Sequence, residues 1–180
     1  MNYAGIGSRE TPKHVLDMMS DIATLLAIDG HICNTGAALG ADQAFANGAN
    51  RVRGAIELAL PWWNYEQAWV KTLHNANITI YDERIHIAAT NSVKQFHPYY
   101  QKLKQGAFKL HARNYLIIEG CGFIICWTVD GKDTGGTGQG IRIAQSLGIR
   151  IYNLFDTETY NAFRERIGAR SNEILTYSTF

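Results

Sequence analysis

Hydrophobic residues along the chain form short uninterrupted runs that alternate with longer stretches in which they recur every three or four positions. Short runs such as residues 122–129 predict strands buried on both faces, and longer stretches such as residues 13–27 predict amphipathic helices. Strands that alternate with helices are typical of a mostly parallel sheet covered by helices. The pattern therefore predicts an α/β fold of three layers around a twisted, mostly parallel sheet.

Glycines and a proline between these runs help to place the individual elements. Pro12 suits the first turn of a helix, and Gly30 and Gly48 suit helix ends. We expect strands at 3–7, 31–35, 54–61, 78–82, 122–129 and 150–155, and helices at 13–27, at 41–48 and at 141–147.

Length and composition fit one globular domain that spans residues 1–180, since 46% of the residues are hydrophobic and 18% are charged. The formal net charge of +1 gives no overall attraction to nucleic acid or to an anionic membrane. Cys33, Cys121 and Cys126 are odd in number and lie in or beside apolar runs, as reduced core thiols do. No segment resembles a signal peptide or a membrane span, so we expect a cytoplasmic protein without a membrane partner.

The first of three loops rich in small residues follows the first predicted strand. It contains Gly5, Gly7, Ser8 and Arg9 at the start of a helix, where free backbone N–H groups and the helix dipole favour an anion. The alternative is a tight turn with Arg9 on the surface.

The second loop, residues 35–45, follows the second predicted strand. Gly36 and Ala37 carry so little side chain that a ligand can approach their backbone closely. Asp42 then falls in the first helical turn, where it either caps the helix or holds a ribose hydroxyl.

The third loop is the glycine-rich segment 133–144 (DTGGTGQGIRIA), which we expect to precede the helix at 141–147. It fits neither the Walker motif nor Gly-x-Gly-x-x-Gly, so alone it is weak evidence for phosphate binding. Three such loops, each between a strand and a helix, favour one pocket that binds phosphates. From this loop we expect contacts by Gly135, Gly136, Thr137, Gly138 and Gln139.

The sequences GSRETP, TGAALGAD and GGTGQGIRIAQSLGIRIYNL together resemble the SLOG superfamily of Rossmann-like domains, of the DNA-processing protein A and lonely-guy type. The resemblance covers roughly residues 2–154. The chain is similar to small stand-alone members of the superfamily from phages and bacteria. It adds Arg113 and Asn114, an Arg-Asn pair before a buried strand, to the expected pocket. It also implies a homodimer or a higher homo-oligomer.

Two departures limit what the resemblance implies. Phosphoribohydrolases of this superfamily place a catalytic glutamate soon after GGTG, whereas this chain continues with Gln139, Gly140 and Ile141. We therefore expect no catalytic residue, with Glu57 and Glu119 as the alternatives that stay open. The second departure is an insert of about fifty residues between the third strand and Arg113, without a clear counterpart in the DNA-processing branch.

The insert has an aromatic cluster and a basic segment. Trp62 and Trp63 belong to PWWNYEQAW, and we expect one of these rings, Trp62 first, to line the pocket and stack on a base, although core packing is the ordinary role. Residues 84–118 contain no Asp or Glu, which favours an anionic partner. The histidines of this segment are too irregularly spaced for a metal site, and we expect neither a metal nor a cofactor.

We predict a protein that senses or sequesters a nucleotide, specifically ADP-ribose or another NAD-derived molecule, without turning it over. Two alternatives stay open. The first is binding of single-stranded DNA in recombination through the basic segment, which predicts steep salt dependence. The second is hydrolysis of a nucleoside monophosphate by a phosphoribohydrolase.

Overall fold

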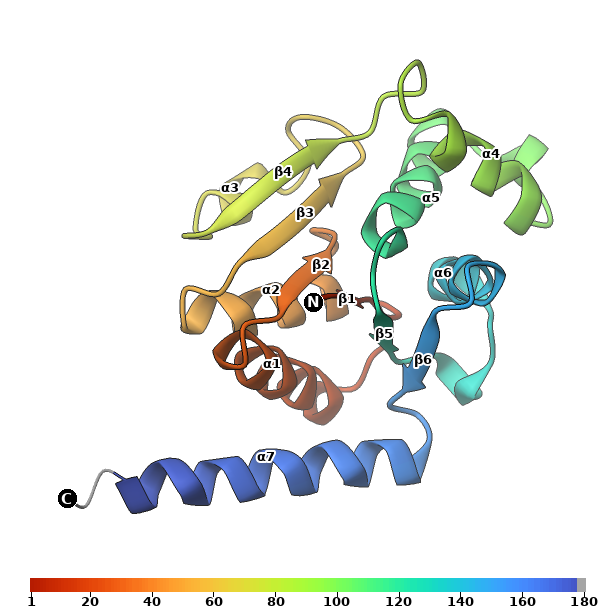
Figure 1. The fold of residues 1–180 in the computed structure, drawn as a ribbon. Helices are drawn as coiled ribbons and strands as arrows, with labels where there is room; N and C mark the ends of the chain where they lie inside the picture. Colours follow the sequence, from red (N-terminus) through yellow and green to blue (C-terminus); the bar gives the residue numbers. More distant parts are fainter. Residues whose placement is uncertain (178–180) are drawn as a thin grey trace.

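A computed structural model describes the backbone of residues 1–177 and the side chains of residues 1–170. Its centre is a six-stranded sheet in the order β4-β3-β2-β1-β5-β6, and all five neighbouring pairs are parallel. The predicted three-layer, mostly parallel α/β fold is thereby confirmed (Figure 1). The strands are β1 (Asn2–Gly5), β2 (Ile32–Thr35), β3 (Ile56–Leu60), β4 (Ala76–Ile80), β5 (Phe123–Cys126) and β6 (Arg150–Asn153).

Helices cover both faces of the sheet. Buried residues of α1 and α2 pack on one face, and those of α5 and α6 pack on the other. Helix α4 packs on α5 and lies farther from the sheet. The helices are α1 (Lys13–Ile28), α2 (Ala41–Arg51), α3 (Gln67–Val70), α4 (Ile87–Phe96), α5 (Gln105–Ile118), α6 (Gly135–Ser146) and α7 (Thr157–Tyr177).

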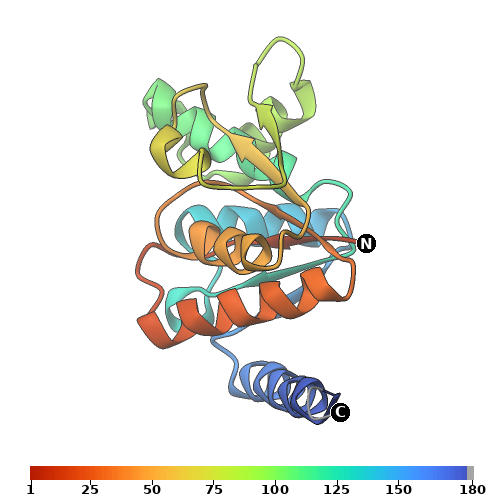
Figure 2. The ribbon, with the colours of Figure 1, turned by 90° about the vertical axis from the view of Figure 1, so that its left-hand side faces the viewer.

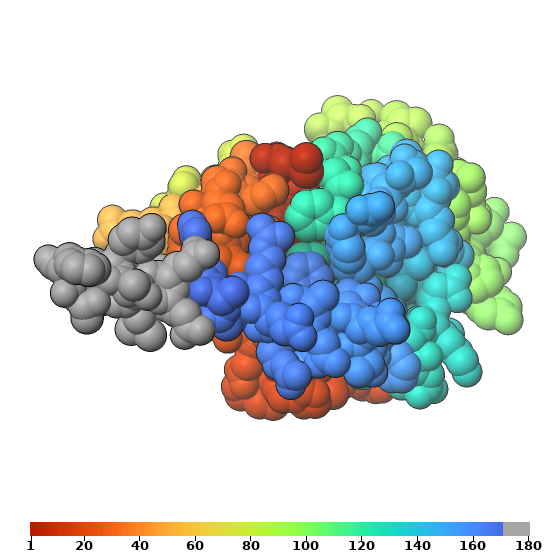
Figure 3. Space-filling model, turned by 60° about the horizontal axis from the view of Figure 1, so that its bottom comes forward, coloured from red at the N-terminus to blue at the C-terminus, as the bar shows by residue number. Residues whose placement is uncertain are grey.

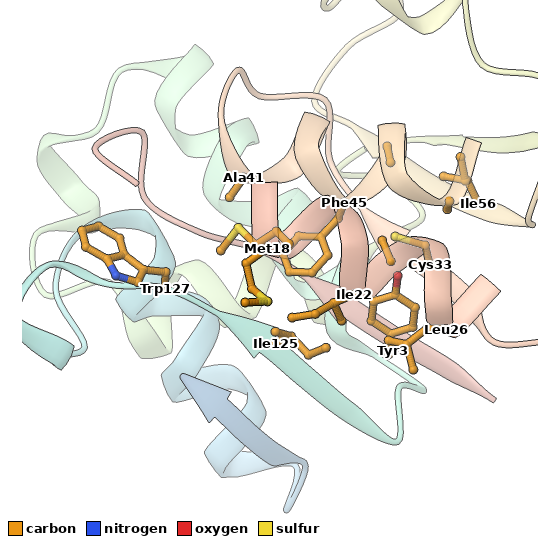
Figure 4. Packing of buried hydrophobic residues seen from close by; sticks show 14 of the residues in the cluster. Tyr3, Met18, Ile22, Leu26, Cys33, Ala41, Phe45, Ile56, Ile125 and Trp127 are labelled. Atoms are coloured by element: carbon orange, nitrogen blue, oxygen red, sulfur yellow. The ribbon is translucent and has the colours of Figure 1, made fainter. Parts of the chain in front are cut away.

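The larger core cluster lies between the sheet and the α1–α2 layer. Tyr3 is fully buried there, with its ring edge-on to Phe45 (Figure 4). It also stacks on Phe123, with ring centroids 5.7 Å apart. Alternate residues of the buried strands serve the two faces, since Tyr3 belongs to this cluster and Ala4 to the cluster under α5 and α6. This division is the two-residue period of a strand buried on both sides.

Gly48 does not end the second helix, which corrects the prediction from its sequence. Helix α2 continues through it to Arg51. A Cβ at Gly48 would lie 2.0 Å from the backbone oxygen of Ser20 on α1, so the glycine permits a close helix–helix contact. Thr24 adds a hydrogen bond from its hydroxyl to the Gly48 carbonyl at 2.9 Å.

The glycine-rich segment is also helical, contrary to the prediction that it is a loop before a helix at 141–147. Helix α6 begins at Gly135. Gly138 must be glycine there, because a Cβ would lie 2.0 Å from the backbone carbonyl of Asp133. Packing thus overrides the low helix propensity of the four glycines in its first two turns.

The insert between β3 and Arg113 forms one edge of the fold. It supplies α3, the edge strand β4, α4 and the first half of α5. Tyr81, Ala89, Val93 and Ala112 form a small buried cluster that joins α4 to α5.

Helix α7 forms the end of the described chain. It lies on the side of α1 that faces away from the sheet (Figure 2). Figure 3 shows it on the surface beside α1. Tyr160, Phe163 and Ile167 are partly buried against the larger core cluster, and Arg166 approaches Asp29 of the α1 C-terminus at 3.5 Å. Within residues 1–177, every helix is too short or too polar to span a bilayer.

The strand order creates a switch point between β1 and β5. From β1 the chain proceeds to β2 on one side, and from β5 it proceeds to β6 on the other. The connections leave opposite faces of the sheet, which opens a crevice at the carboxyl ends of these two strands.

Candidate functional site

A cavity of about 550 Å³ lies at this switch point, and we call it the β1–β5 cavity. Its volume falls in the ordinary range of small-molecule sites, about 300–1,000 Å³. The loops after β1, β2 and β5 and one face of α5 build its wall. The lining residues are Ile6, Gly7, Ser8, Arg9, Glu10, Ala38, Asp42, Leu110, His111, Arg113, Asn114, Thr128, Val129, Thr134, Gly135, Gly136 and Thr137.

The loop after β1 runs along the extension of β5. The N–H groups of Ile6 and Ser8 donate to the carbonyls of Ile125 and Trp127 at 3.1 and 3.2 Å. Gly7 lies between these two residues, and Arg9 follows Ser8. The backbone N–H groups of Gly7 and Arg9 donate no hydrogen bond within residues 1–177. Ser8 is turned inward on its own loop, because its Oγ accepts the N–H of Glu10 at 3.1 Å.

Arg9 differs from the other arginine of the cavity wall in being exposed. Its side chain makes neither an ion pair nor a hydrogen bond with the part of the chain that the structure describes. It therefore presents to the β1–β5 cavity a positive charge that is in no ion pair with a described residue, next to exposed Glu10 on the same loop.

The first turn of α6 forms another part of the wall. Gly135 has a φ of +65°, which a glycine adopts without strain, and no side chain caps the helix. The first intrahelical donor is the N–H of Gly138, which bonds the carbonyl of Thr134 at 2.9 Å. The N–H groups of Gly135, Gly136 and Thr137 consequently remain free among the described residues, at the positive end of the helix dipole.

Arg113 and Asp42 form a buried ion pair below this turn. Their Nη2 and Oδ2 atoms lie 3.0 Å apart, with side chains 5% and 8% exposed. Oδ2 also accepts the N–H of Ala38 at 3.3 Å, so Asp42 braces the loop after β2. A Cβ at Gly36 would lie 1.7 Å from Arg113 Nη1, so the absent side chain there accommodates the guanidinium.

A second polar network joins α5 to α6. Gln139 is fully buried, and its Oε1 accepts hydrogen bonds from His111 Nδ1 at 2.8 Å and Asn114 Nδ2 at 3.0 Å. The Nε2 atom of Gln139 and the Nε atom of Arg113 are buried without a partner. Buried donors without a partner are costly to the folded state.

The structure brings nine of the predicted residues to the β1–β5 cavity and leaves the others elsewhere. Gly5 lies within β1, Gly36 and Ala37 are covered by protein, and Gly138 and Gln139 lie behind the first turn of α6. The residues brought together are Gly7, Ser8, Arg9, Asp42, Arg113, Asn114, Gly135, Gly136 and Thr137.

Trp62 does not reach the β1–β5 cavity, contrary to expectation. Its ring packs edge-on against Tyr65, with centroids 5.1 Å apart, and its edge faces Gly106 near the start of α5. Trp63 is 71% exposed and is also absent from the cavity wall. The tryptophan cluster follows β3, which is two strands away from β1.

His111 is the chief site residue that sequence reasoning missed. It stands two positions before Arg113, but no helical period for residues 105–118 was recognised, so nothing placed it beside the other loops. Thr128 and Thr134 were missed for a simpler reason, since hydroxyl residues after a strand carry no distinctive pattern.

The carboxylates of the cavity wall are Asp42 and Glu10. Asp42 is held by Arg113, whereas Glu10 is exposed and its side chain has no partner among the described residues. Glu57 bonds Asn77 and Glu119 accepts the Tyr115 hydroxyl, and neither belongs to the wall. Glu10 is thus the carboxylate of the wall that is in no ion pair with a described residue.

The cysteines lie away from this chemistry. Burial raises the pKa of the Cys33, Cys121 and Cys126 thiols to about 12, which leaves them protonated and unreactive at neutral pH. No group of three His, Cys, Asp or Glu side chains suitable for a metal occurs among the described residues.

The basic segment, residues 84–118, has fewer unpaired positive charges in the structure than its sequence indicates, because two of its arginines are paired with aspartates. Arg113 is paired with Asp42, and Arg84 forms a two-pronged contact with Asp82. Four lysines of the segment make no ion pair with the described residues: Lys94, Lys102, Lys104 and Lys109.

Comparisons with known proteins agree with the fold. The sequence matches no family and no curated protein. The structure is similar to that of DNA processing protein A (DprA) from Streptococcus pneumoniae, with a TM-score of 0.58 and 17% sequence identity. The match covers 84% of this chain and 49% of that chain, so this chain spans about half the length of that protein. The Moco carrier protein of Chlamydomonas rheinhardtii matches with a TM-score of 0.39 and 12% identity over 93% of this chain and 97% of that chain.

The likeness to DprA is a likeness of fold. This chain shares a Rossmann-like arrangement of strands and helices with that protein.

Proposed function

We propose that the β1–β5 cavity binds a nucleotide, ADP-ribose or another NAD-derived molecule, and releases it unchanged. The observation that carries the proposal is that two segments of the cavity wall have backbone N–H groups without a hydrogen bond to the described residues. One segment contains Gly7 and Arg9, and the other is the turn 135–137. Both follow strands at the switch point, where open parallel sheets bind their ligands. We further propose that the chain belongs to the SLOG superfamily, in agreement with its fold.

The phosphates of the ligand would lie between these two segments. Free N–H donors at a helix N-terminus, aligned with the helix dipole, form an anion site. Arg9 adds a charge that is in no ion pair with a described carboxylate. Arg113 lies beneath and contributes less charge, because Asp42 compensates it.

Asp42 would take a ribose hydroxyl. Its Oδ2 is occupied by Arg113 and the Ala38 N–H, while its Oδ1 has no hydrogen bond to the described residues. A carboxylate oxygen fixed by an ion pair is a suitable acceptor for a hydroxyl donor. Arg113 thereby acts as a positioning residue for Asp42.

The residues behind the α6 turn support the proposal of binding without turnover. Gln139, which is neutral, is buried and holds His111 and Asn114. A general base must be within reach of the reacting group. The wall offers His111 and exposed Glu10, and neither stands after the GGTG turn, where phosphoribohydrolases of the superfamily place their glutamate.

Isothermal titration calorimetry with ADP-ribose tests the proposal. We expect the wild-type protein to bind, and Arg9→Gln to bind roughly tenfold or more weakly, as the loss of a charge-assisted hydrogen bond implies. Arg53→Gln is the matched control, since Arg53 is exposed and lies beyond α2, away from the cavity wall. Absence of heat with ADP-ribose and its cyclic relatives would overturn the proposal.

Two other outcomes would change the function rather than the site. Release of free base from a nucleoside monophosphate, abolished by Glu10→Gln, would establish hydrolysis. Steeply salt-dependent binding of oligonucleotides, reduced by Lys104→Gln, would establish a nucleic-acid partner. We also propose a homo-oligomer, which light scattering during size-exclusion chromatography tests.

A further inference from the structure

His111 lines the β1–β5 cavity, and its two ring nitrogens differ. Nδ1 is hydrogen-bonded within the described part of the protein, whereas Nε2 is not. Its Nδ1 lies 2.8 Å from Gln139 Oε1, which also accepts the Asn114 amide at 3.0 Å. An amide oxygen can only accept, so Nδ1 carries the proton in the neutral ring. The remaining nitrogen, Nε2, is then a bare acceptor.

The accessible edge of this ring lies beside the free amides of α6. A Cβ at Gly136 would lie 3.9 Å from His111 Cε1, the atom between the two nitrogens. The Nε2 atom has no hydrogen bond among the described residues and is not one of the buried unpaired atoms. His111 and the turn 135–137 therefore border the same part of the cavity wall.

Two arginines and a histidine lie near the ring, and burial lowers the pKa of that histidine, His97. His97 at the end of α4 touches the His111 ring, with ring centroids 4.4 Å apart, and Arg113 and Arg142 approach from α5 and α6. Burial lowers the pKa of His111, and the three neighbours lower it further. The hydrogen bond to Gln139 acts in the opposite direction but does not outweigh them. Without a bound anion, His111 is therefore the neutral ring at neutral pH.

The nearby carboxylates do not reverse this balance. Asp42 is paired with Arg113, and Asp133 is paired with Arg142 at 3.3 Å. Glu10 and Arg9 stand together on the loop after β1, both exposed. His111 consequently lacks a carboxylate partner of its own among the described residues.

We propose that His111 is a ligand of the anionic group bound at the α6 turn, and that it takes up a proton at Nε2 when this group binds. The ligand class is a phosphate or diphosphate ester, so the inference rests on the proposed function and adds a residue and a proton to it. Nδ1–H continues to donate to Gln139 in both states, so protonation requires no rearrangement of the network. A phosphate oxygen supplies the opposite charge that the empty site lacks.

The consequence is a pH dependence of affinity with a definite sign. The bound state holds more protons than the free state, so affinity rises as the pH falls. The limit for one linked proton is about a tenfold change in affinity per pH unit. The dependence disappears at a pH low enough to protonate His111 in the empty protein.

Calorimetry with ADP-ribose in two buffers of different ionisation enthalpy at neutral pH measures the proton directly. The diphosphate of ADP-ribose has no group that titrates near neutral pH, so any uptake belongs to the protein. We expect uptake of a fraction of a proton in the wild type. His111→Asn, whose amide can still donate toward Gln139, should bind more weakly and take up none.

The matched control is His31→Asn, because His31 lies at the amino end of β2, opposite the cavity edge. It should retain the wild-type uptake. Nitrogen-15 spectra of the imidazoles give a second readout, in which His111 of the free protein should show the Nδ1–H form.

The outcomes separate the two proposals. Binding with no buffer dependence, or with uptake that survives in His111→Asn, overturns the role of His111 and leaves the proposed function standing. Absence of binding in every buffer overturns both.

Discussion

Arg113 Nη2 lies 3.0 Å from Asp42 Oδ2, in an ion pair buried between α5 and α2 below the β1–β5 cavity. The partners are 71 residues apart in the sequence, so the pair ties the insert-derived helix to the loop after β2. Gly36 accommodates it, because a side chain there would occupy the place of the guanidinium.

Removing one partner of this pair should lower the free energy of unfolding more than removing both partners does. We expect Arg113→Met to lower the free energy of unfolding by about 3–5 kcal/mol, since it leaves the Asp42 charge buried. The double variant Asp42→Leu with Arg113→Met should recover part of this loss. Urea denaturation of the two single variants and the double variant gives the coupling, and strictly additive losses would contradict the account.

Gly36→Ala should displace the guanidinium without touching any ligand. A Cβ would lie 1.7 Å from Arg113 Nη1 and 2.4 Å from Asp42 Oδ2. We expect a loss of stability of about 1–3 kcal/mol by overpacking, together with weaker binding of ADP-ribose. Gly168→Ala is the control, because no atom lies within 4 Å of its built Cβ and α7 should gain slightly in stability.

Two glycines of α6 should respond in opposite ways. Gly138→Ala places a Cβ 2.0 Å from the Asp133 backbone, so it should shift the helix start and lower the melting temperature by several degrees. Gly136→Ala meets nothing closer than 3.9 Å and should preserve the fold while its methyl group obstructs the cavity. Equal melting temperatures for the two variants would contradict the placement of Asp133 against α6.

The buried thiols predict a loss of stability at high pH. Their pKa values are about 12 in the folded protein, against 9.0 for an ordinary thiol. The unfolded chain therefore loses these protons first, and the free energy of unfolding should fall as the pH rises from 9 to about 12. Each thiol contributes at most about 1.4 kcal/mol per pH unit.

Urea melts over this range in reducing buffer check the effect. Cys126→Ala removes one of the three thiols and should flatten the pH dependence, apart from a constant loss from the small cavity it leaves. An unchanged slope would show that Cys126 does not hold its proton in the folded state.

Several elements of the fold could be predicted because hydrophobic periodicity reports burial directly. The predicted strands all overlap strands of the sheet, and α1 runs one residue past its predicted end, from Lys13 to Ile28. Gly48 and the glycines of α6 misled the prediction, because the sequence does not show whether a glycine ends a helix or admits a neighbour. The contacts with Ser20 and Asp133 answer that question only in three dimensions.

The candidate site could be predicted where each residue follows its own strand. Arg9 and Gly135 are examples, since both lie on the connections that leave β1 and β5, the strands that meet at the switch point. Trp62 follows β3, and only the order of the strands shows that β3 is remote from β5. His111 depends on the course of α5 across the sheet, for which the insert offered no recognisable pattern.

The central claim is that the free amides of two segments of the cavity wall bind the phosphates of one nucleotide. Amide proton–nitrogen spectra of the labelled protein during titration with ADP-ribose test it most directly. The account predicts the largest shifts at the N–H groups of Gly7, Arg9, Gly135, Gly136 and Thr137. Unchanged spectra, or shifts confined to the lysine-bearing surface of residues 94–109, would contradict it.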